Sequence, residues 1–245
     1  MTVTARAIPM LSDNYAWLLT ELSTGTTALV DPAEAAPAME ILKAQDQTLD
    51  FIFLTHHHAD HIGGVPALVA AYHPKVVGNE ADAKRLPPLD INVHEGSVIA
   101  FGAASVRVLE VPGHTLGHIA YYITGDEGGA GLLLCGDTLF SLGCGRLFEG
   151  SPEQMFASLA KFKQLPGSTL ICAGHEYTQA NAVFAKTVEP DNEDLKKRTR
   201  DIAALRAKGL PTLPVTLEQE LACNPFLRAN TAADFAALRR AKDQF

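Results

Sequence analysis

Residues 49–64 read LDFIFLTHHHADHIGG. The apolar run at 51–54 is typical of a buried strand, and four histidines and one aspartate follow it closely. In an extended segment alternate side chains lie on one side, about 6.6 Å apart, so His56 and His58 can converge on one ion while His57 points away. Asp60 and His61 come after the chain turns toward a helix and can reach a second ion. Imidazole and carboxylate groups are ligands that zinc accepts where thiolates are missing.

Three further predicted strands end just before a residue that can bind a metal. They are Ser105–Val111 before His114, Leu132–Cys135 before Asp137, and Leu170–Ala173 before His175. Taken alone, His114 or His175 is more often a hydrogen-bonded structural residue, and Asp137 a cap or turn residue. The cluster at 56–61 has no such packing purpose. The four strand ends together predict a single site at one edge of a sheet.

The pattern of elements changes near residue 176. Before it, short apolar runs alternate with turn signals, and helices are predicted at about 34–45, 64–72 and 152–164. After it, helical periods at 178–188, 191–208, 217–222 and 231–242 replace the strands. We therefore predict an α+β protein with a domain at 1–175 and a smaller helical domain at 176–245.

Composition excludes several classes of protein. The chain has 245 residues, of which 47% are hydrophobic and 20% charged, as in ordinary globular proteins. It has no apolar run near 18 residues, no signal-peptide pattern and no C-x-x-C pair among its four cysteines. The net charge of −8 disfavours the binding of nucleic acid. Residues 146–245 are less acidic, with 14 basic and 12 acidic side chains. We expect a cytoplasmic monomer that binds neither nucleic acid nor membrane.

The H-x-H-x-D-H motif with a later His, Asp and His resembles the metallo-β-lactamase superfamily. Further motifs resemble the glyoxalase II, or hydroxyacylglutathione hydrolase, family within it. They are Ser12-Asp13-Asn14-Tyr15, Val30-Asp31-Pro32, Pro112-Gly113-His114-Thr115-Leu116-Gly117-His118, Gly136-Asp137-Thr138-Leu139-Phe140, Gly174-His175-Glu176-Tyr177-Thr178, Asn224-Pro225-Phe226-Leu227-Arg228 and Lys242-Asp243-Gln244-Phe245. The resemblance covers the chain from residue 12 to its end.

This resemblance implies an αββα sandwich and two divalent metal ions, with zinc expected and iron or manganese as alternatives. One ion would be held by His56, His58 and His114 and the other by Asp60, His61 and His175, with Asp137 bridging both. Asp60 and Asp137 would thereby position a bridging hydroxide that attacks the thioester of S-D-lactoylglutathione. The products would be glutathione and D-lactate, as in methylglyoxal detoxification. Asp60, as a metal ligand, is a poor candidate for a general base.

Glutathione carries two carboxylates, so its binding site should be basic. Arg239 and Lys242 share a face of the last predicted helix, and the resemblance places them with Arg146 and Tyr177 around glutathione. The alternative is that the basic residues of this helix form a solvated face, as we expect for Arg240. The family is expected to have Lys at position 146 and often Tyr at 148, so Arg146 and Phe148 should alter glutathione affinity.

The leaving group agrees with a thioester. A thiol with a pKa near about 8.5 leaves as a thiolate largely unaided, and no His or Glu is clearly reserved as a general acid. Asp31 and His118 are candidates for orienting the imidazoles, with plain loop structure as the alternative. Competing interpretations are an iron-dependent persulfide dioxygenase, a lactonase, β-lactamase or RNA-processing enzyme on the same fold, and a vestigial metal-binding protein.

Overall fold

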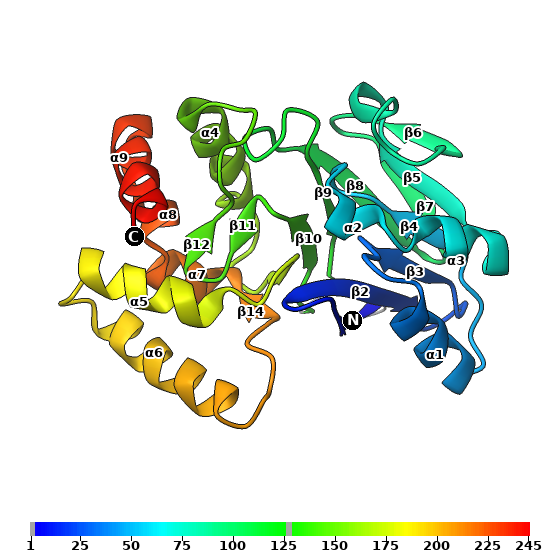
Figure 1. Ribbon diagram of the computed structural model, residues 1–245, viewed down its shortest axis with the longest axis horizontal. Helices are drawn as coiled ribbons and strands as arrows, with labels where there is room; N and C mark the ends of the chain where they lie inside the picture. Colours follow the sequence, from blue (N-terminus) through cyan, green and yellow to red (C-terminus); the bar gives the residue numbers. More distant parts are fainter. Residues whose placement is uncertain (1–2, 126–128) are drawn as a thin grey trace.

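Two six-stranded sheets pack face to face in the computed structural model, which describes residues 3–125 and 129–245 (Figure 1). The first sheet has the strand order β1-β2-β3-β4-β5-β6, and the second β14-β13-β10-β9-β8-β7. The strands of the first sheet are β1 (Val3–Met10), β2 (Asn14–Glu21), β3 (Thr27–Val30), β4 (Phe51–Phe53), β5 (Lys75–Asn79) and β6 (Ile91–Val93). Those of the second are β7 (Val98–Phe101), β8 (Ala104–Glu110), β9 (Ile119–Ile123), β10 (Leu132–Gly136), β13 (Leu170–Ala173) and β14 (Val215–Thr216).

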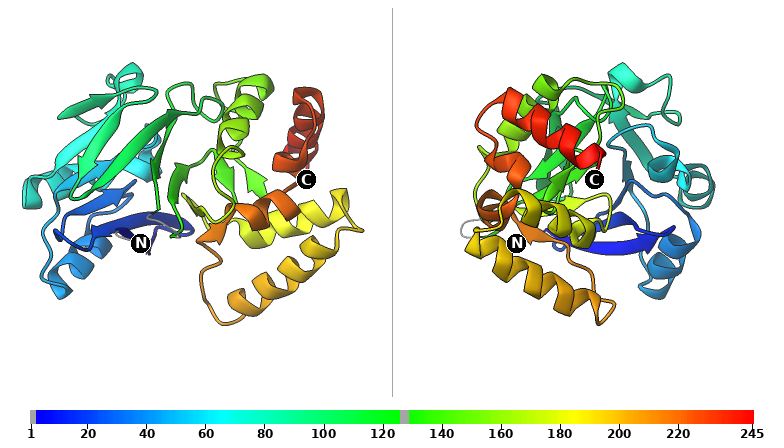
Figure 2. Two further views of the ribbon diagram at one scale, coloured as in Figure 1. Left: turned by 180° about the vertical axis from the view of Figure 1, so that it is seen from behind. Right: turned by 60° about the vertical axis from the view of Figure 1, so that its left-hand side comes forward.

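Helices cover the outer faces of both sheets, and several gather at one end of the molecule (Figure 2). Those within the first 175 residues are α1 (Ala36–Ala44), α2 (Ala59–Ile62), α3 (Val65–Tyr72), the 3-10 helix η1 (Glu80–Asp82) and α4 (Pro152–Phe162). Those that follow are α5 (Thr178–Val188), α6 (Glu193–Arg206), α7 (Leu217–Cys223), α8 (Pro225–Arg228) and α9 (Ala232–Asp243). A short hairpin, β11 (Leu139–Phe140) with β12 (Gly143–Cys144), lies between β10 and α4.

Strand β2 illustrates why both faces of the first sheet are apolar. Its side chains alternate, with Trp17 and Leu19 in the core between the sheets and Leu18 in the core beneath α1 and α3. A strand buried on both faces has no polar side to present, which explains its nearly continuous apolar run. The α-on-β layers follow from this burial and confirm the predicted sandwich.

Two predictions about the elements were wrong. Residues 3–10 form β1, which the analysis of the sequence missed because its outward side chains are polar and interrupt the apolar run. Strands also do not end at residue 176, because β14 pairs antiparallel with β13 at the edge of the second sheet. None of the helices in the described ranges is long and apolar enough to cross a membrane.

Candidate metal centre

The seven predicted ligands converge from the ends of strands in both sheets. His56 and His58 follow β4 of the first sheet, and Asp60 and His61 lie on α2. The other three follow strands of the second sheet, namely His114 after β8, Asp137 after β10 and His175 after β13. The prediction of one sheet edge therefore needs correction: the site lies where neighbouring edges of two sheets meet.

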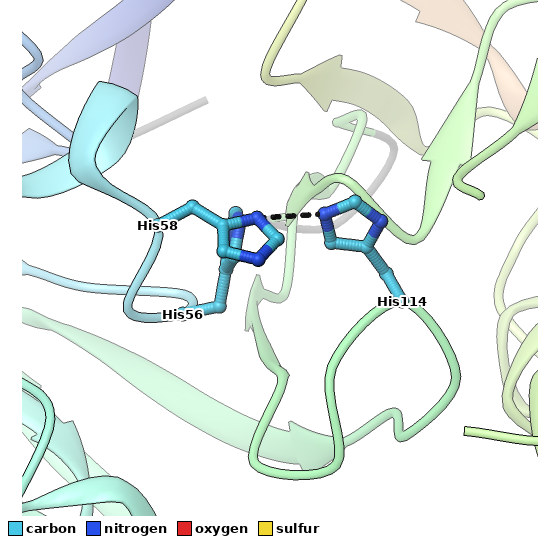
Figure 3. A group of neighbouring side chains, drawn as sticks. All are labelled: His56, His58 and His114. Carbon is cyan, nitrogen blue, oxygen red and sulfur yellow. Dashed lines mark hydrogen bonds between the residues drawn. The ribbon is translucent and has the colours of Figure 1, made fainter. Parts of the chain in front are cut away.

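His56, His58 and His114 form a first group of potential metal ligands. Nε2 of His56 lies 3.1 Å from Nδ1 of His58, which lies 3.0 Å from Nε2 of His114. Figure 3 shows a ring nitrogen of His58 and one of His114 pointing toward each other, with the two rings nearly perpendicular. Three imidazole nitrogens within a few ångströms of one another suit a metal ion better than a hydrogen-bonded network.

Asp60, His61 and His175 form a second group beside the first. Nε2 of His175 lies 3.4 Å from Oδ2 of Asp60, and Nε2 of His61 lies 3.6 Å from the same oxygen. Asp137 lies between the two groups, with its carboxylate 3.3 Å from His175, 3.4 Å from His61 and 3.6 Å from His114. Among the ion pairs of the described residues, Asp137 is the one carboxylate that pairs with imidazoles of both groups.

Two atoms at the centre have the signature expected of metal ligands. His61 Nε2 and Asp137 Oδ1 are buried and have no hydrogen-bond partner among the described residues. Such buried polar atoms are costly unless something binds them. Gly174 leaves the space beside them free, because a Cβ at this position would lie 2.6 Å from Asp137 Oδ1. The donor set therefore fits divalent ions.

The electrostatic environment favours the ionised carboxylate. Burial raises the pKa of Asp137, but His61 and His175 outweigh burial and hold this pKa well below its usual value. Burial lowers the pKa of His56, His58 and His114, which favours the neutral imidazole that a metal requires. Burial also acts on His61, but Asp137 and Asp31 raise its pKa well above the usual value.

A cavity of about 710 Å³ opens from the metal-ligand groups toward the helical end of the chain. Its wall contains His58, Asp60, His114, Asp137 and His175, and also all four predicted glutathione-binding residues, Arg146, Tyr177, Arg239 and Lys242. The residues predicted for chemistry and for binding thus share a single cavity, although they come from both parts of the chain.

Comparisons with known proteins agree with this arrangement. The chain matches the metallo-β-lactamase superfamily over residues 11–175 and the hydroxyacylglutathione hydrolase C-terminus over residues 176–245. It is 52% identical over 242 residues to the hydroxyacylglutathione hydrolase of Acidiphilium cryptum (strain JF-5), covering 99% of this chain and 97% of that protein. It is 54% identical over 231 residues to that of Jannaschia sp. (strain CCS1), covering 94% and 89%. The chain belongs to the hydroxyacylglutathione hydrolase family.

Solved structures confirm the fold of this family member. ETHE1 from Myxococcus xanthus superposes with a TM-score of 0.73 at 24% identity, covering 97% of this chain and 90% of that one. TTHA1623 in a di-iron-bound form superposes with a TM-score of 0.57 at 32% identity, covering 70% and 91%. The metallo-β-lactamase fold and the His/Asp groups together support divalent metal binding by this member of the hydroxyacylglutathione hydrolase family.

Arg239 differs from what a solvated helix face would show. Its side chain is only 5% exposed, and it donates hydrogen bonds to Asp243 (3.0 Å) and to the Cys144 carbonyl (2.9 Å). Lys242 instead lies over the rings of Phe184 and Phe245, and burial and the nearby Arg239 lower its pKa. Arg240 is exposed. Arg239 therefore does not belong to a solvated helix face. Part of its guanidinium group already forms hydrogen bonds with Asp243 and Cys144.

The other cavity residues lie closer to the metal-ligand groups. Tyr177 stacks on His175 with a ring separation of 4.6 Å, and burial raises its pKa to about 12. Arg146 is exposed, with its Nε 4.0 Å from Asp243. Phe148 is 63% exposed, and its ring lies 5.6 Å from that of His58 and 5.2 Å from that of His114, steeply inclined to both. Phe148 has no hydroxyl group and can offer only apolar contact there.

Residues behind the ligands were predicted in part. Asp31 accepts hydrogen bonds from the Thr55 amide (2.8 Å) and hydroxyl (2.6 Å), and lies 3.1 Å from His61 Nδ1. His118 accepts from the backbone amide of Asp137 at 3.1 Å, and its ring stacks on that of His56 with the centroids 4.6 Å apart. Asp13 was not predicted to act here, yet its carboxylate lies 2.9 Å from His175 Nδ1. The Asp13-Asn14-Tyr15 motif was the available signal, but it lay far from the histidines.

Proposed function

We propose that this member of the hydroxyacylglutathione hydrolase family hydrolyses S-(2-hydroxyacyl)glutathione thioesters such as S-D-lactoylglutathione. The products are glutathione and a 2-hydroxy acid such as D-lactate, as required for methylglyoxal detoxification. The observation that carries the proposal is the single cavity of about 710 Å³ that joins both metal-ligand groups to Arg146 and Lys242. A substrate that has both a reactive carbonyl and carboxylates matches a cavity whose wall contains both potential metal ligands and basic side chains.

The chain provides ligands for two divalent ions. His56, His58 and His114 hold one ion, Asp60, His61 and His175 hold the other, and Asp137 reaches both. Zinc suits these donors, and iron or manganese can replace it. The di-iron form of TTHA1623, 32% identical, supports a count of two. When bound, such a pair lowers the pKa of water to supply a nucleophile at neutral pH, and its charge stabilises an oxyanion.

The residues of the chain orient the reactants. Asp60 and Asp137 act as ligands that position the nucleophile, and Asp60 is therefore not a free base for proton transfer. The leaving thiolate needs no dedicated acid because the pKa of its parent thiol is only about 8.5. Arg146 and Lys242 attract the carboxylates of glutathione. Arg239 lines the same cavity, as does Tyr177, whose ring stacks on that of His175.

Two parts of the chain divide this work. We propose that residues 1–175 form the catalytic domain and that residues 176–245 form a helical domain that contributes Tyr177, Arg239 and Lys242. The two family matches, which meet between residues 175 and 176, support this division. The enzyme acts as a cytoplasmic monomer. Its four buried, unpaired cysteines are consistent with a reducing compartment.

The experiment is to follow the loss of thioester absorbance from S-D-lactoylglutathione, using chelator-treated and remetallated protein in parallel. We expect hydrolysis that disappears with the metal and returns on adding zinc. Protein shown to hold two ions but unable to hydrolyse the thioester would overturn the proposal. Oxygen uptake with glutathione persulfide would then favour the dioxygenase, although the hydroxyacylglutathione hydrolase match over residues 176–245 argues against it.

A further inference from the structure

The two metal-ligand groups differ in what lies behind their imidazoles. In the second group Nδ1 of His61 lies 3.1 Å from the Asp31 carboxylate, and Nδ1 of His175 lies 2.9 Å from the Asp13 carboxylate. Both rings thus direct Nε2 at the ion position and Nδ1 at an anion. A carboxylate behind an imidazole fixes its orientation and makes it a more basic ligand.

The first group has neutral partners instead. Nδ1 of His56 lies 3.0 Å from the Thr55 hydroxyl, and Nδ1 of His114 donates to the Arg146 carbonyl at 2.8 Å. Nε2 of His58 has no hydrogen-bond partner among the side-chain contacts of the described residues. Asp31 accepts a hydrogen bond from the Thr55 hydroxyl and makes no direct hydrogen bond to His56 among the described residues, although its carboxylate lies within 4.8 Å of a His56 ring nitrogen. The charge behind these three rings is therefore smaller than that behind His61 and His175.

Direct ligands increase the difference. Asp137 reaches both groups, but Asp60 belongs to the second group alone. The second group therefore has two carboxylates that the first lacks, Asp60 as a potential ligand and Asp13 behind His175, and Asp31 contacts its His61 directly. A divalent cation in a largely buried site is stabilised by each of these negative charges.

Asp13 belongs to a loop that is built onto the second group. The amide of Tyr15 donates to the Gly174 carbonyl and that of Glu176 to the Asp13 carbonyl, both at 2.8 Å, so this loop brackets His175. The Asn14 side chain donates to the Asp60 carbonyl (3.0 Å) and carboxylate (3.1 Å). Two adjacent residues of one turn thus hold two of the three ligands.

We propose that the group of Asp60, His61 and His175 binds its divalent ion more tightly than the group of His56, His58 and His114 and fills first, with Asp13 as a positioning residue. This inference rests on the proposed two-ion site. Asp13 is well suited to a test because its side chain is 40% exposed, so that Asp13→Asn removes a charge without opening the core.

The test is to titrate chelator-treated full-length protein with Co²⁺ or Zn²⁺, following heat, the Co²⁺ absorption spectrum and the number of ions bound. We expect two separate binding steps. His175→Ala should abolish the tighter step and His114→Ala the weaker one. Asp13→Asn should weaken the tighter step by about 10–100-fold and leave the weaker step nearly unchanged. Asp201→Asn, on the exposed face of α6, is the control for an equal change of charge.

Two equal steps, loss of the weaker step in His175→Ala, or an unchanged tighter step in Asp13→Asn would each overturn the inference. Thioester hydrolysis measured on the same samples separates it from the proposed function. Stepwise binding without hydrolysis would refute the proposed function alone. Hydrolysis with two equal steps would refute only the inference, and a failure to bind any ion would refute both.

Discussion

Asp137 is the side chain that lies between the two groups of potential metal ligands. Its carboxylate is buried and lies within 3.6 Å of His61, His114 and His175. It is also fixed from behind, because His118 accepts a hydrogen bond from its backbone amide. Because its carboxylate lies beside imidazoles of both groups, loss of Asp137 should weaken the binding of both ions together.

Asp137→Ala should therefore abolish thioester hydrolysis and metal binding in parallel. The variant would lose the one carboxylate that reaches imidazoles of both groups, and Asp60 would remain on one side only. Metal analysis of the purified variant, combined with the thioester assay, checks this expectation. Full activity, or two tightly bound ions, would show that Asp137 does not hold both.

Arg239 and Lys242 have different environments, so their substitutions should differ. Lys242→Ala should raise KM for glutathione thioesters with a smaller effect on kcat, and leave stability nearly unchanged. Arg239→Ala should also raise KM, but it should cost about 1–3 kcal/mol of stability because the Cys144 carbonyl and Asp243 lose a buried donor. Steady-state kinetics and denaturant unfolding of both variants distinguish these effects. An unchanged KM in both would remove α9 from the glutathione site.

Among the elements, the hairpin of β11 and β12 depends on α7. Glu220 is buried on α7 and accepts hydrogen bonds from the Ser141 hydroxyl (2.7 Å) and the Leu142 amide (2.8 Å) at the hairpin turn. The side-chain amide of Asn224, just after α7, donates to the Phe140 and Gly143 carbonyls (3.1 and 3.0 Å). The hairpin ends at Cys144, directly before the cavity wall formed by Arg146. A buried carboxylate in residues 176–245 thus holds an element of residues 1–175.

Glu220 should make stability depend on pH. Burial raises its pKa above 4.5, and its hydrogen bonds only partly oppose this. The folded protein then binds this proton more tightly than the unfolded chain, so the contribution to stability is present below pH 4.5 and declines as pH rises through the raised pKa. Glu220→Gln lacks this titration, and the stability of wild type relative to this variant should fall between about pH 4 and neutral pH. Urea unfolding of both proteins across this range would show it, and a constant difference would contradict it.

At the scale of the whole molecule, the helical end and the sandwich share one core. Phe235 of α9 is fully buried, with its ring 5.7 Å from that of Phe226 on α8 and 6.4 Å from that of Phe156 on α4. It belongs to the same apolar cluster as the residues between the sheets, such as Tyr121. The position of α9, and hence of Lys242, therefore depends on packing against α4 and the sandwich.

Phe235→Ala should destabilise the protein by about 3–5 kcal/mol, because it leaves a cavity at this junction. It should also raise KM for the thioester as α9 loses its support. Phe148→Ala removes the same group from an exposed position and should change stability by less than about 0.5 kcal/mol. Chemical denaturation of both variants tests the pair, and equal losses of stability would argue against a shared core.

The sequence by itself determined the ligand types and the fold class. His56, His58, Asp60 and His61 lie within six positions, and local periodicity predicted the strands before the other ligands. Even the helix α5 begins and ends as predicted, at 178 and 188. These features depend on near neighbours in the chain, and a pattern of residue types records them directly.

Tertiary structure alone decided how these parts meet. Asp13 and His175 are 162 positions apart, and Glu220 and Ser141 are 79 apart, so no local period links them. The same holds for the meeting of two sheets at the metal centre and for the hydrogen bond from Arg239 to the Cys144 carbonyl, 95 positions away. Such contacts arise when packing of the whole chain brings distant backbone segments together, and it is this packing that makes the two metal-ligand groups unequal.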